Sequence, residues 1–251
     1  MTIESSLYKN KSLLGSYWKL KDCEDRLILS SSQQNKITPL FAKLLLLRNV
    51  SNDNVKDYLE SNLSNNLPNP FLLKDMDRSV ERTITAIKKN EKIGIIADYD
   101  VDGSTSASIL YKFLNQLTEE IILKIQNRLS EGYGPNLRIM NEMQNHNVSL
   151  VFTLDCGTTS FKIIDNEEYK NIDVVIIDHH LSEAILPNVY SIINPNRYDE
   201  KSEFNQMSAV GITFLFLMAL RKKLRDQKFF NHTTNQPNLL SFLDLVALGT
   251  V

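Results

Sequence analysis

Residues 93–103 read Ile-Gly-Ile-Ile-Ala-Asp-Tyr-Asp-Val-Asp-Gly, an apolar run that ends in three alternating aspartates. The run has the length and composition of a buried parallel strand. Two other segments share this layout: residues 151–157 read Val-Phe-Thr-Leu-Asp-Cys-Gly, and residues 174–180 read Val-Val-Ile-Ile-Asp-His-His. Open α/β sheets bind their ligands at the carboxyl ends of the strands. We therefore expect acidic and histidine side chains to gather at one edge of a parallel sheet.

Around these segments the chain alternates between strand-like and helix-like patterns. The predicted strands lie near residues 92–97, 120–126, 148–154, 172–177 and 189–193, and the predicted helices near residues 77–90, 104–117, 136–146, 159–169, 208–225 and 238–248. This order favours an α/β fold with a doubly wound, mostly parallel sheet. Residues 76–251 are the expected α/β domain.

A small helical region is expected before this domain, over residues 1–75. Residues 1–35 are polar and aperiodic, which predicts an extended arm that fixes one aromatic residue of the Tyr17-Trp18 pair to the body. Two helices are predicted over residues 38–48 and 52–63, and residues 64–69 are predicted to be a loop.

The bulk composition is that of an ordinary soluble protein, with 42% hydrophobic and 23% charged residues and a formal net charge of −2. Without a general basic field, binding of a polyanion would depend on local Lys and Arg residues and on metal ions. Cys23 and Cys156 are too few for a disulfide framework or a structural zinc site. No signal peptide or membrane-spanning segment is evident. We predict a monomer in the cytoplasm, with no membrane partner.

The aspartates at 98, 100 and 102 form the most specific cluster. In extended backbone, side chains two residues apart share a face, so the three carboxylates would point into one site. Their mutual repulsion makes a cation the natural partner. Gly103 would permit a tight turn, and Ser104 would cap the next helix, whose free amides could hold a phosphate oxygen. The alternative is a solvated acidic turn followed by a helix cap.

Two further clusters follow the other apolar runs. Asp155 could bind a metal or cap the next helix. In Asp178-His179-His180 a neutral imidazole could bind metal while the carboxylate orients a ring, the alternative being two exposed loop histidines. The loop Asn127–Gly134 holds Arg128, a candidate phosphate ligand, although it could be a simple glycine-rich connector. Arg138 and Arg197 are further candidate phosphate contacts.

Taken together, these motifs resemble those of the DHH phosphoesterase superfamily, named after the triplet found here at residues 178–180. Within it, the chain is most similar to the RecJ family of exonucleases, which are specific for single-stranded DNA. The segments that carry the resemblance, in the same order as in the family, are Asp77 to Gly103, Glu131-Gly-Tyr-Gly, Thr153-Leu-Asp155-Cys-Gly157, Asn194-Pro195, Val210-Gly211 and Asp244-Leu-Val-Ala-Leu-Gly-Thr-Val251.

The resemblance implies a phosphodiesterase with two divalent cations, Mn²⁺ or Mg²⁺, that degrades single-stranded DNA from its 5′ end in DNA repair and recombination. A single-strand-binding protein and a helicase are its implied candidate partners. By matching position, the implied catalytic residues are Asp98, Asp100, Asp102, Asp155, Asp178, His179 and His180, of which Asp98, Asp100, Asp102, Asp155 and His179 would bind metal. The candidate substrate-binding residues are His180, Ser104, Arg128 and Arg197.

The sequence departs from the family pattern at two places and at its end. Ala97 stands where Gly is usual, and Ser208-Ala209 stand where Ala-Gly is common. In the family, the segment that matches Gly249-Thr-Val251 is followed at once by Ala-Asp, and that Asp is a fourth-motif metal ligand. We therefore expect the catalytic domain to be incomplete at its C-terminal end, with the DHH-associated second domain absent, so that the chain can be inactive alone.

Three other functions stay open. One is a hydrolase of short oligonucleotides or cyclic dinucleotides from the same superfamily. Another is a phosphatase of the haloacid-dehalogenase type, because Asp100-Val-Asp102-Gly-Ser resembles the nucleophile motif of those enzymes. That chemistry does not call for Asp-His-His. The third is a catalytically inactive DHH scaffold, against which the intact motifs argue.

Overall fold

The computed structural model of the chain describes residues 11–17, 21–60, 62–127, 132–231 and 235–251. The chain divides into two compact units, Met1–Pro68 and Asn69–Val251. The second unit thus begins before the expected boundary at residue 76. The reason is that the 3-10 helix η2 (Pro70–Leu72) packs against helices of the α/β unit.

Unit 1 is helical, with α2 (Asp25–Asn35), α3 (Pro39–Leu47), the 3-10 helix η1 (Asn52–Asn54), α4 (Val55–Leu59) and α5 (Leu63–Asn66). The Thr38 hydroxyl accepts a hydrogen bond from the Phe41 N–H at 3.3 Å, and Pro39 occupies the first turn of α3. Two predictions were wrong here. Helix α2 lies within the expected extended arm, because Ile28 is buried where α2 packs on α3, and α5 lies in the expected loop. Trp18 is outside the described residues.

Unit 2 contains a five-stranded parallel sheet in the order β2-β1-β3-β4-β5. The strands are β1 (Ile93–Ala97), β2 (Ile121–Ile125), β3 (Leu150–Leu154), β4 (Asp173–Ile177) and β5 (Ser191–Ile193). All five lie within three residues of their predicted bounds. Ala97 is paired with Leu154, and Leu154 with Ile177, so β1, β3 and β4 end level with one another. The residues that follow them therefore share one edge.

The strand order also explains which loops meet. From β1 the chain moves outward to β2, then returns past β1 to β3 and continues in the opposite direction to β5. The direction of winding reverses between β1 and β3, and ligands of open α/β sheets bind at such a reversal. Asp98 follows β1 and Asp155 follows β3. The fold therefore places both aspartates at the reversal point.

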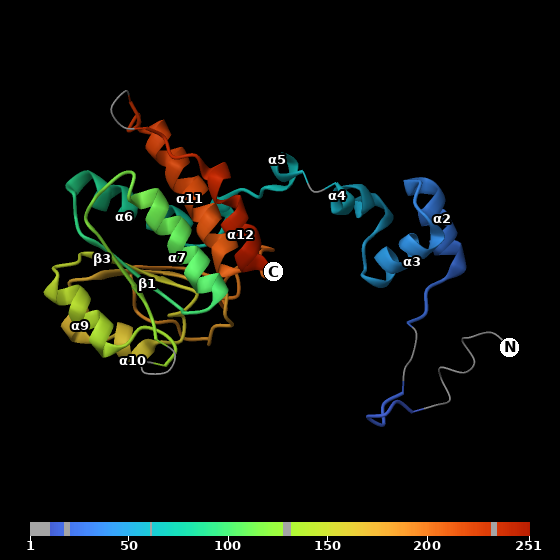
Figure 1. Cartoon of the computed structure of the whole chain (residues 1–251), viewed down its shortest axis with the longest axis horizontal. Helices are drawn as coiled ribbons and strands as arrows, with labels where there is room; N and C mark the ends of the chain where they lie inside the picture. The colour runs from blue at the N-terminus through green and yellow to red at the C-terminus, as the bar shows by residue number, and fades with distance from the viewer. Residues whose placement is uncertain (1–10, 18–20, 61, 128–131, 232–234) are drawn as a thin grey trace. The chain divides into compact units, whose positions relative to one another are not determined.

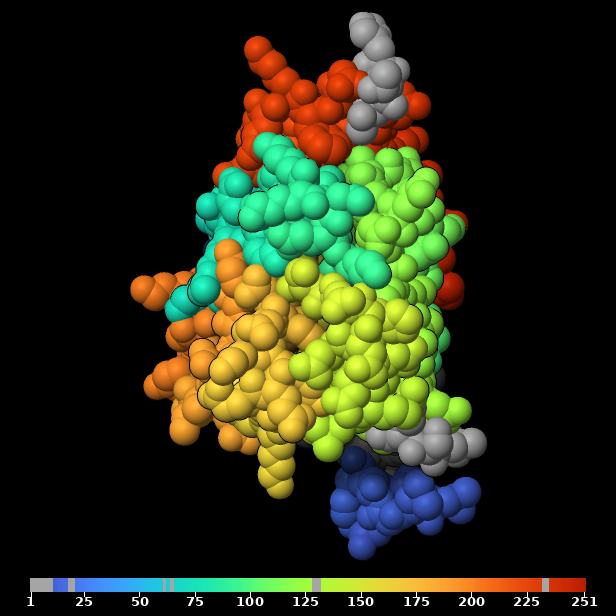
Figure 2. Space-filling view, turned by 90° about the vertical axis from the view of Figure 1, so that its left-hand side faces the viewer, coloured from blue at the N-terminus to red at the C-terminus, as the bar shows by residue number. Residues whose placement is uncertain are grey.

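Helices cover both faces of the sheet, as expected for a doubly wound fold (Figure 1). One face carries α6 (Met76–Lys89), α7 (Val101–Leu114), α11 (Ala209–Asp226) and α12 (Leu243–Thr250), and the other carries α9 (Leu137–Asn145) and α10 (Phe161–Ile164). Adjacent residues of β3 face opposite layers. Val151 lies in a core with Met140 and Met143, whereas the Phe152 ring packs edge-on against Phe216, 5.6 Å away between centroids. In Figure 2, the teal surface of α6 lies between the red C-terminal part of the chain and the yellow segment that contains α10.

Four helical predictions had wrong bounds or continuity. The expected helix over 52–63 is η1 followed by α4, which ends at Leu59. The expected helix over 159–169 is α10 followed by the 3-10 helix η3 (Glu167–Tyr169), and the expected helix over 238–248 is the 3-10 helix η4 (Leu239–Phe242) followed by α12. Helix α7 begins at Val101 and not at residue 104, with Asp100 as its N-cap. In the described part of the chain, no helix combines the length and the apolar composition needed to cross a membrane.

Candidate metal centre

Three loops bring acidic and histidine side chains together at the carboxyl edge of the sheet. Two groups of possible metal ligands result, Asp155–His179–His180 and Asp98–Asp100–Asp155. Within each group one ligand atom from every residue lies within 4.8 Å of the others. Asp155 belongs to both groups, so the fold places it between two potential ion sites. The carboxylates and the histidines come from loops that are far apart in sequence.

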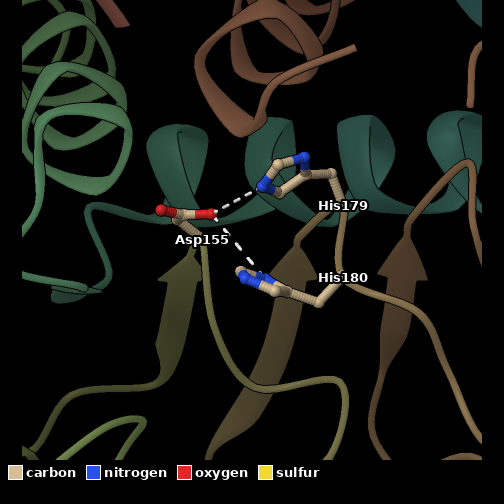
Figure 3. A group of neighbouring side chains, drawn as sticks. All are labelled: Asp155, His179 and His180. Carbon is tan, nitrogen blue, oxygen red and sulfur yellow. Dashed lines mark ion pairs between the residues drawn. The ribbon is translucent and has the colours of Figure 1, made fainter. Parts of the chain in front are cut away.

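In the first group, both histidines face the Asp155 carboxylate (Figure 3). Oδ1 of Asp155 lies 3.2 Å from Nε2 of His179 and 3.8 Å from Nδ1 of His180. This oxygen is buried and accepts no hydrogen bond of good geometry from the described residues. Asp155 itself has a left-handed backbone, with φ of 59°, which is rare for a residue other than glycine.

In the second group, Asp98 and Asp100 follow β1. Asp98 is buried, with 4% exposure, while Asp100 is exposed. One oxygen of Asp100, Oδ1, accepts the Gly103 N–H at 2.8 Å as the N-cap of α7. The sequence had assigned this cap to Ser104, which lies inside the helix with its hydroxyl 3.4 Å from the Tyr99 carbonyl oxygen. A capping carboxylate keeps its second oxygen for another ligand.

The Asp178 carboxylate does not face the other acidic side chains but accepts hydrogen bonds from the loop that carries His179 and His180. It is buried, and its Oδ1 accepts hydrogen bonds from the N–H groups of His179 (2.8 Å) and His180 (3.2 Å), while Oδ2 accepts the Thr158 N–H (3.2 Å). Nδ1 of His180 lies 2.8 Å from the same Oδ1. A carboxylate on one ring nitrogen fixes the orientation of an imidazole and leaves the other nitrogen for a ligand or substrate.

The electrostatics of the site suit the binding of a cation. Burial, and then the charges of Asp102 and Asp100, raise the pKa of Asp155 to about 7. The hydrogen bond to Asp178 raises the pKa of His180 to about 9. The Asp155 carboxylate, whose Oδ1 lies 3.2 Å from Nε2 of His179, raises the pKa of His179 as well. Protons therefore neutralise the crowded carboxylates here, and a divalent cation would do so more effectively.

The donor atoms fit divalent cations. The all-carboxylate group offers hard oxygen ligands, which suit Mg²⁺ and Mn²⁺, and the group with two imidazoles suits a transition ion such as Mn²⁺. The buried Oδ1 of Asp155 has the free lone pairs that a bridging ligand needs. Asp98, Asp100, Asp155, His179 and His180 are the residues that could hold two ions.

Asp102 is not among them in the described structure, although the sequence grouped it with Asp98 and Asp100. Its two oxygens accept the N–H groups of Ala209 and Val210 at 2.8 and 2.7 Å. The sequence argument assumed extended backbone through residue 102, but α7 has already begun at Val101. A residue in the first helical turn no longer alternates with its neighbours, so Asp102 points toward α11.

The candidate phosphate contacts have different outcomes. Arg197 is 8% exposed, and its guanidinium donates to Asp75 (2.8 Å), Asp199 (2.7 Å) and the Ile192 carbonyl (2.6 Å). These contacts give Arg197 a structural role beside β5. Arg138 lies on α9 near Glu142. Arg128 lies outside the described residues, so its prediction is untested.

Sequence reasoning missed a set of side chains that shape the site. The Tyr133 hydroxyl donates to the Asp155 carbonyl at 2.9 Å and lies 3.1 Å from Nδ1 of His180. Asn194 donates from Nδ2 to the His180 carbonyl at 2.9 Å, and Asn196 donates from Nδ2 to the His179 carbonyl at 2.5 Å. The available signals were the tyrosine between two glycines and the Asn-Pro-Asn run after the last strand. Neither signal gives a contact without the fold.

Gly103 allows the first turn of α7 to lie close to the backbone of Asp98. The sequence pattern had instead indicated a tight turn at Gly103. A Cβ atom there would lie 2.5 Å from the carbonyl oxygen of Asp98. We expect Gly103→Ala to destabilise the protein by about 1–3 kcal/mol, because the first turn of α7 must move off Asp98. Helix propensity alone would give the opposite sign, a gain of about 1 kcal/mol.

Urea unfolding measures this difference, and Gly211→Ala is the matched control in the first turn of α11. A Cβ atom at Gly211 would meet the flexible Met207 side chain, with Cε at 3.2 Å. We expect this variant to be neutral or slightly stabilised. Equal stability of the two variants would show that the contact with Asp98 does not require glycine.

Comparisons with known proteins agree with this geometry. The profile described as "DHH family, N-terminal domain" matches residues 92–250. The chain is 30% identical over 234 residues to the single-stranded-DNA-specific exonuclease RecJ of Bacillus subtilis, covering 93% of this chain and 28% of that protein. It is 33% identical over 215 residues to RecJ of Haemophilus influenzae, covering 85% of this chain and 36% of that protein. The chain therefore spans about a third of the length of these relatives.

A solved structure shares the fold. A crystal structure of exonuclease RecJ bound to manganese superposes with a TM-score of 0.60 and 28% sequence identity, covering 71% of this chain and 43% of that one. The five-stranded parallel sheet and its helices are thus those of the RecJ DHH domain.

Proposed function

Since the chain belongs to the DHH family, we propose that it is the catalytic part of an exonuclease that hydrolyses single-stranded DNA with two divalent cations, Mn²⁺ or Mg²⁺. The observation that carries this proposal is the convergence of Asp98, Asp100, Asp155, His179 and His180 on one edge of the sheet. The relatives named RecJ act on single-stranded DNA, and one structure of RecJ holds manganese. Cleavage from the 5′ end and a role in DNA repair and recombination belong to the same proposal.

The ions, when bound, would lower the pKa of a water molecule and stabilise charge on the attacking and leaving oxygens. The chain's own residues contribute placement and charge. Asp98, Asp100 and Asp155 supply the negative charge that holds cations at this edge. The imidazole of His180 is half-exposed and oriented by Asp178, and its raised pKa keeps it protonated at neutral pH in the metal-free protein. It is therefore placed to contact a phosphate oxygen.

The decisive experiment compares substrates in the presence and absence of metal. We expect hydrolysis of a labelled single strand to mononucleotides with Mn²⁺ or Mg²⁺, none with EDTA, and slower hydrolysis of a duplex. A dinucleotide or cyclic dinucleotide offered in parallel tests for an oligonucleotide hydrolase, and a preference for these short substrates would overturn the exonuclease proposal. A single-strand-binding protein and a helicase are proposed partners, which a pull-down from the host with this chain as bait would test.

Asp100→Asn separates metal binding from folding. Asparagine is as good an N-cap as aspartate, so the hydrogen bond to the Gly103 N–H and the stability of α7 should persist. The loss of one anionic ligand should weaken Mn²⁺ binding at least about 10-fold and reduce hydrolysis accordingly. Calorimetric titration measures the affinity for Mn²⁺, and thermal unfolding measures the stability of the protein. Unchanged Mn²⁺ affinity would exclude Asp100 as a ligand.

A further inference from the structure

The N-terminus of α11 is held by a side chain from another helix. The first N–H groups of an α-helix have no partner inside the helix. In α11 the Gly211 N–H donates to the Ser208 hydroxyl at 3.3 Å, as in an ordinary N-cap. The two N–H groups before it, on Ala209 and Val210, donate to Oδ2 and Oδ1 of Asp102 at 2.8 and 2.7 Å. Asp102 thus completes the cap of α11 from a position 107 residues earlier in the chain.

Asp102 and Asp100 differ in how many of their carboxylate oxygens accept hydrogen bonds from backbone amides. Asp100 gives one oxygen to a backbone amide and is exposed, whereas Asp102 gives both oxygens, and its side chain is only 13% exposed. A carboxylate is favoured at a helix N-terminus because the helix dipole is positive there. Turning Asp102 toward a metal ion would leave two amide groups of α11 without acceptors, which is costly in a buried place.

Asp102 nevertheless lies beside the cluster. Its Oδ2 is 3.7 Å from Nε2 of His179, whose other neighbour is Asp155 at 3.2 Å. The same carboxylate therefore contacts the start of α11 and the edge of the histidine ring. Helix α11 packs against α7, so the contact also joins the two helices that begin next to the site.

We infer that Asp102 is a positioning residue: it anchors the N-terminus of α11 to α7 and holds the His179 ring in place, and it is not a metal ligand. This inference rests on the proposed metal site. It removes Asp102 from the ligand set that the sequence suggested and leaves Asp98, Asp100 and Asp155 as the carboxylate ligands.

Amide hydrogen exchange at Ala209 and Val210 tests the inference directly. In the wild-type protein, addition of Mg²⁺ should leave the exchange rates of these two amides within about two-fold of their metal-free values, because their acceptor does not move. A ligand role predicts the opposite. Coordination would draw the carboxylate away from α11, and the two amides would exchange at least about ten-fold faster. That result would overturn the inference.

Asp102→Asn and Ser208→Ala form a matched pair at the same helix end. Asparagine offers one acceptor, so at least one of the Ala209 and Val210 amides should exchange faster in the metal-free variant, and the ¹⁵N shift of His179 Nε2 should change. Ser208→Ala weakens the same cap but should leave the His179 signal as in the wild type. The number of Mn²⁺ ions bound per chain, counted by equilibrium dialysis, should be equal in all three proteins. If only Asp102→Asn bound one Mn²⁺ ion fewer per chain, Asp102 would be a metal ligand.

The two proposals can fail separately. If the wild type binds neither Mn²⁺ nor Mg²⁺, the proposed function is wrong. The metal-free comparison of Asp102→Asn with Ser208→Ala still decides whether Asp102 anchors α11. The anchoring role would be overturned if, in Asp102→Asn, the Ala209 and Val210 amides exchanged as in the wild type and the His179 signal did not change. This outcome does not depend on whether the protein binds metal.

Discussion

Asp155→Asn is expected to raise the dissociation constant for Mn²⁺ by at least about 100-fold, the largest effect of any single substitution at this site. Asp155 is shared by both groups of possible ligands, and its Oδ1 is buried between them. Asparagine keeps the shape of the side chain and tolerates the left-handed backbone that Asp155 adopts, with φ of 59°. The loss would therefore come from charge and coordination, and not from unfolding.

The protonation of Asp155 should also make the stability of the protein in EDTA depend on pH. Burial, followed by the charges of Asp102 and Asp100, raises the pKa of Asp155 to about 7, so the folded protein holds this proton more tightly than the unfolded chain. The wild type should therefore lose stability as pH rises from about 4 through 7. The hydrogen bond to Asp178 raises the pKa of His180 from 6.5 to about 9. Deprotonation of His180 should therefore lower the stability further as pH rises from about 6.5 to 9.

Asp155→Asn should lack the lower part of this pH dependence and should equal or exceed the metal-free wild type in stability at pH 8. Urea unfolding between pH 5 and pH 9 measures both curves, and added Mn²⁺ should stabilise the wild type most at high pH, where it competes with fewer protons. Asp165→Asn is a control for loss of charge, because Asp165 is exposed and its carboxylate accepts the Asn188 N–H, with no other acceptor role seen among the described residues. Wild-type Mn²⁺ affinity in Asp155→Asn would refute the shared-ligand role.

Asp178→Ala is expected to cost about 2–4 kcal/mol of folding free energy, because it removes the acceptor of three backbone N–H groups and one imidazole nitrogen. Asp178 is buried, so water cannot easily replace the lost acceptor. Burial acts to raise the pKa of Asp178, but the hydrogen bonds from His180 and Thr158 outweigh it and lower that pKa. Its stabilising charge is therefore present throughout the neutral range.

A second readout makes this prediction specific to the site. Without Asp178, the pKa of His180 should fall from about 9 toward 6.5, which ¹H NMR titration of the metal-free protein would detect. Asp165→Ala again serves as control, since it removes a carboxylate with one exposed hydrogen bond and should cost less than about 1 kcal/mol. An unchanged pKa of His180 in Asp178→Ala would mean that the carboxylate does not hold that ring.

Much of the site could be predicted because its parts are local in sequence. Each of the segments 93–98, 150–155 and 173–178 combines an apolar run with the polar residue that ends it, and both signals lie within a few residues. The parallel pairing of these runs then brings their ends to one edge. Asp98, Asp155 and Asp178 were found in this way. The carboxylate of Asp178 faces the histidine loop and Thr158 instead of the cluster, which no local pattern reveals.

Two residues singled out from the sequence have other neighbours or positions in the structure. Arg197 was a candidate phosphate contact, and Asp75, 122 residues away, pairs with it. Ser104 looked like a helix cap, but the helix begins earlier at Val101, with Asp100 as its cap. The partner of Arg197 is fixed by long-range packing, whereas the cap of α7 is local and depends on the residue at which the helix begins.

By itself, the sequence determined the five strands, the α/β class and the acidic and histidine residues that end the apolar runs, because periodicity and composition act over a few residues. Only the tertiary structure decided which of these side chains face each other. Asp155 meets His179, whereas Asp102 meets the first amides of α11. The physical reason is that buried carboxylates take the nearest donors the fold provides, and those donors lie on segments that only long-range packing brings together.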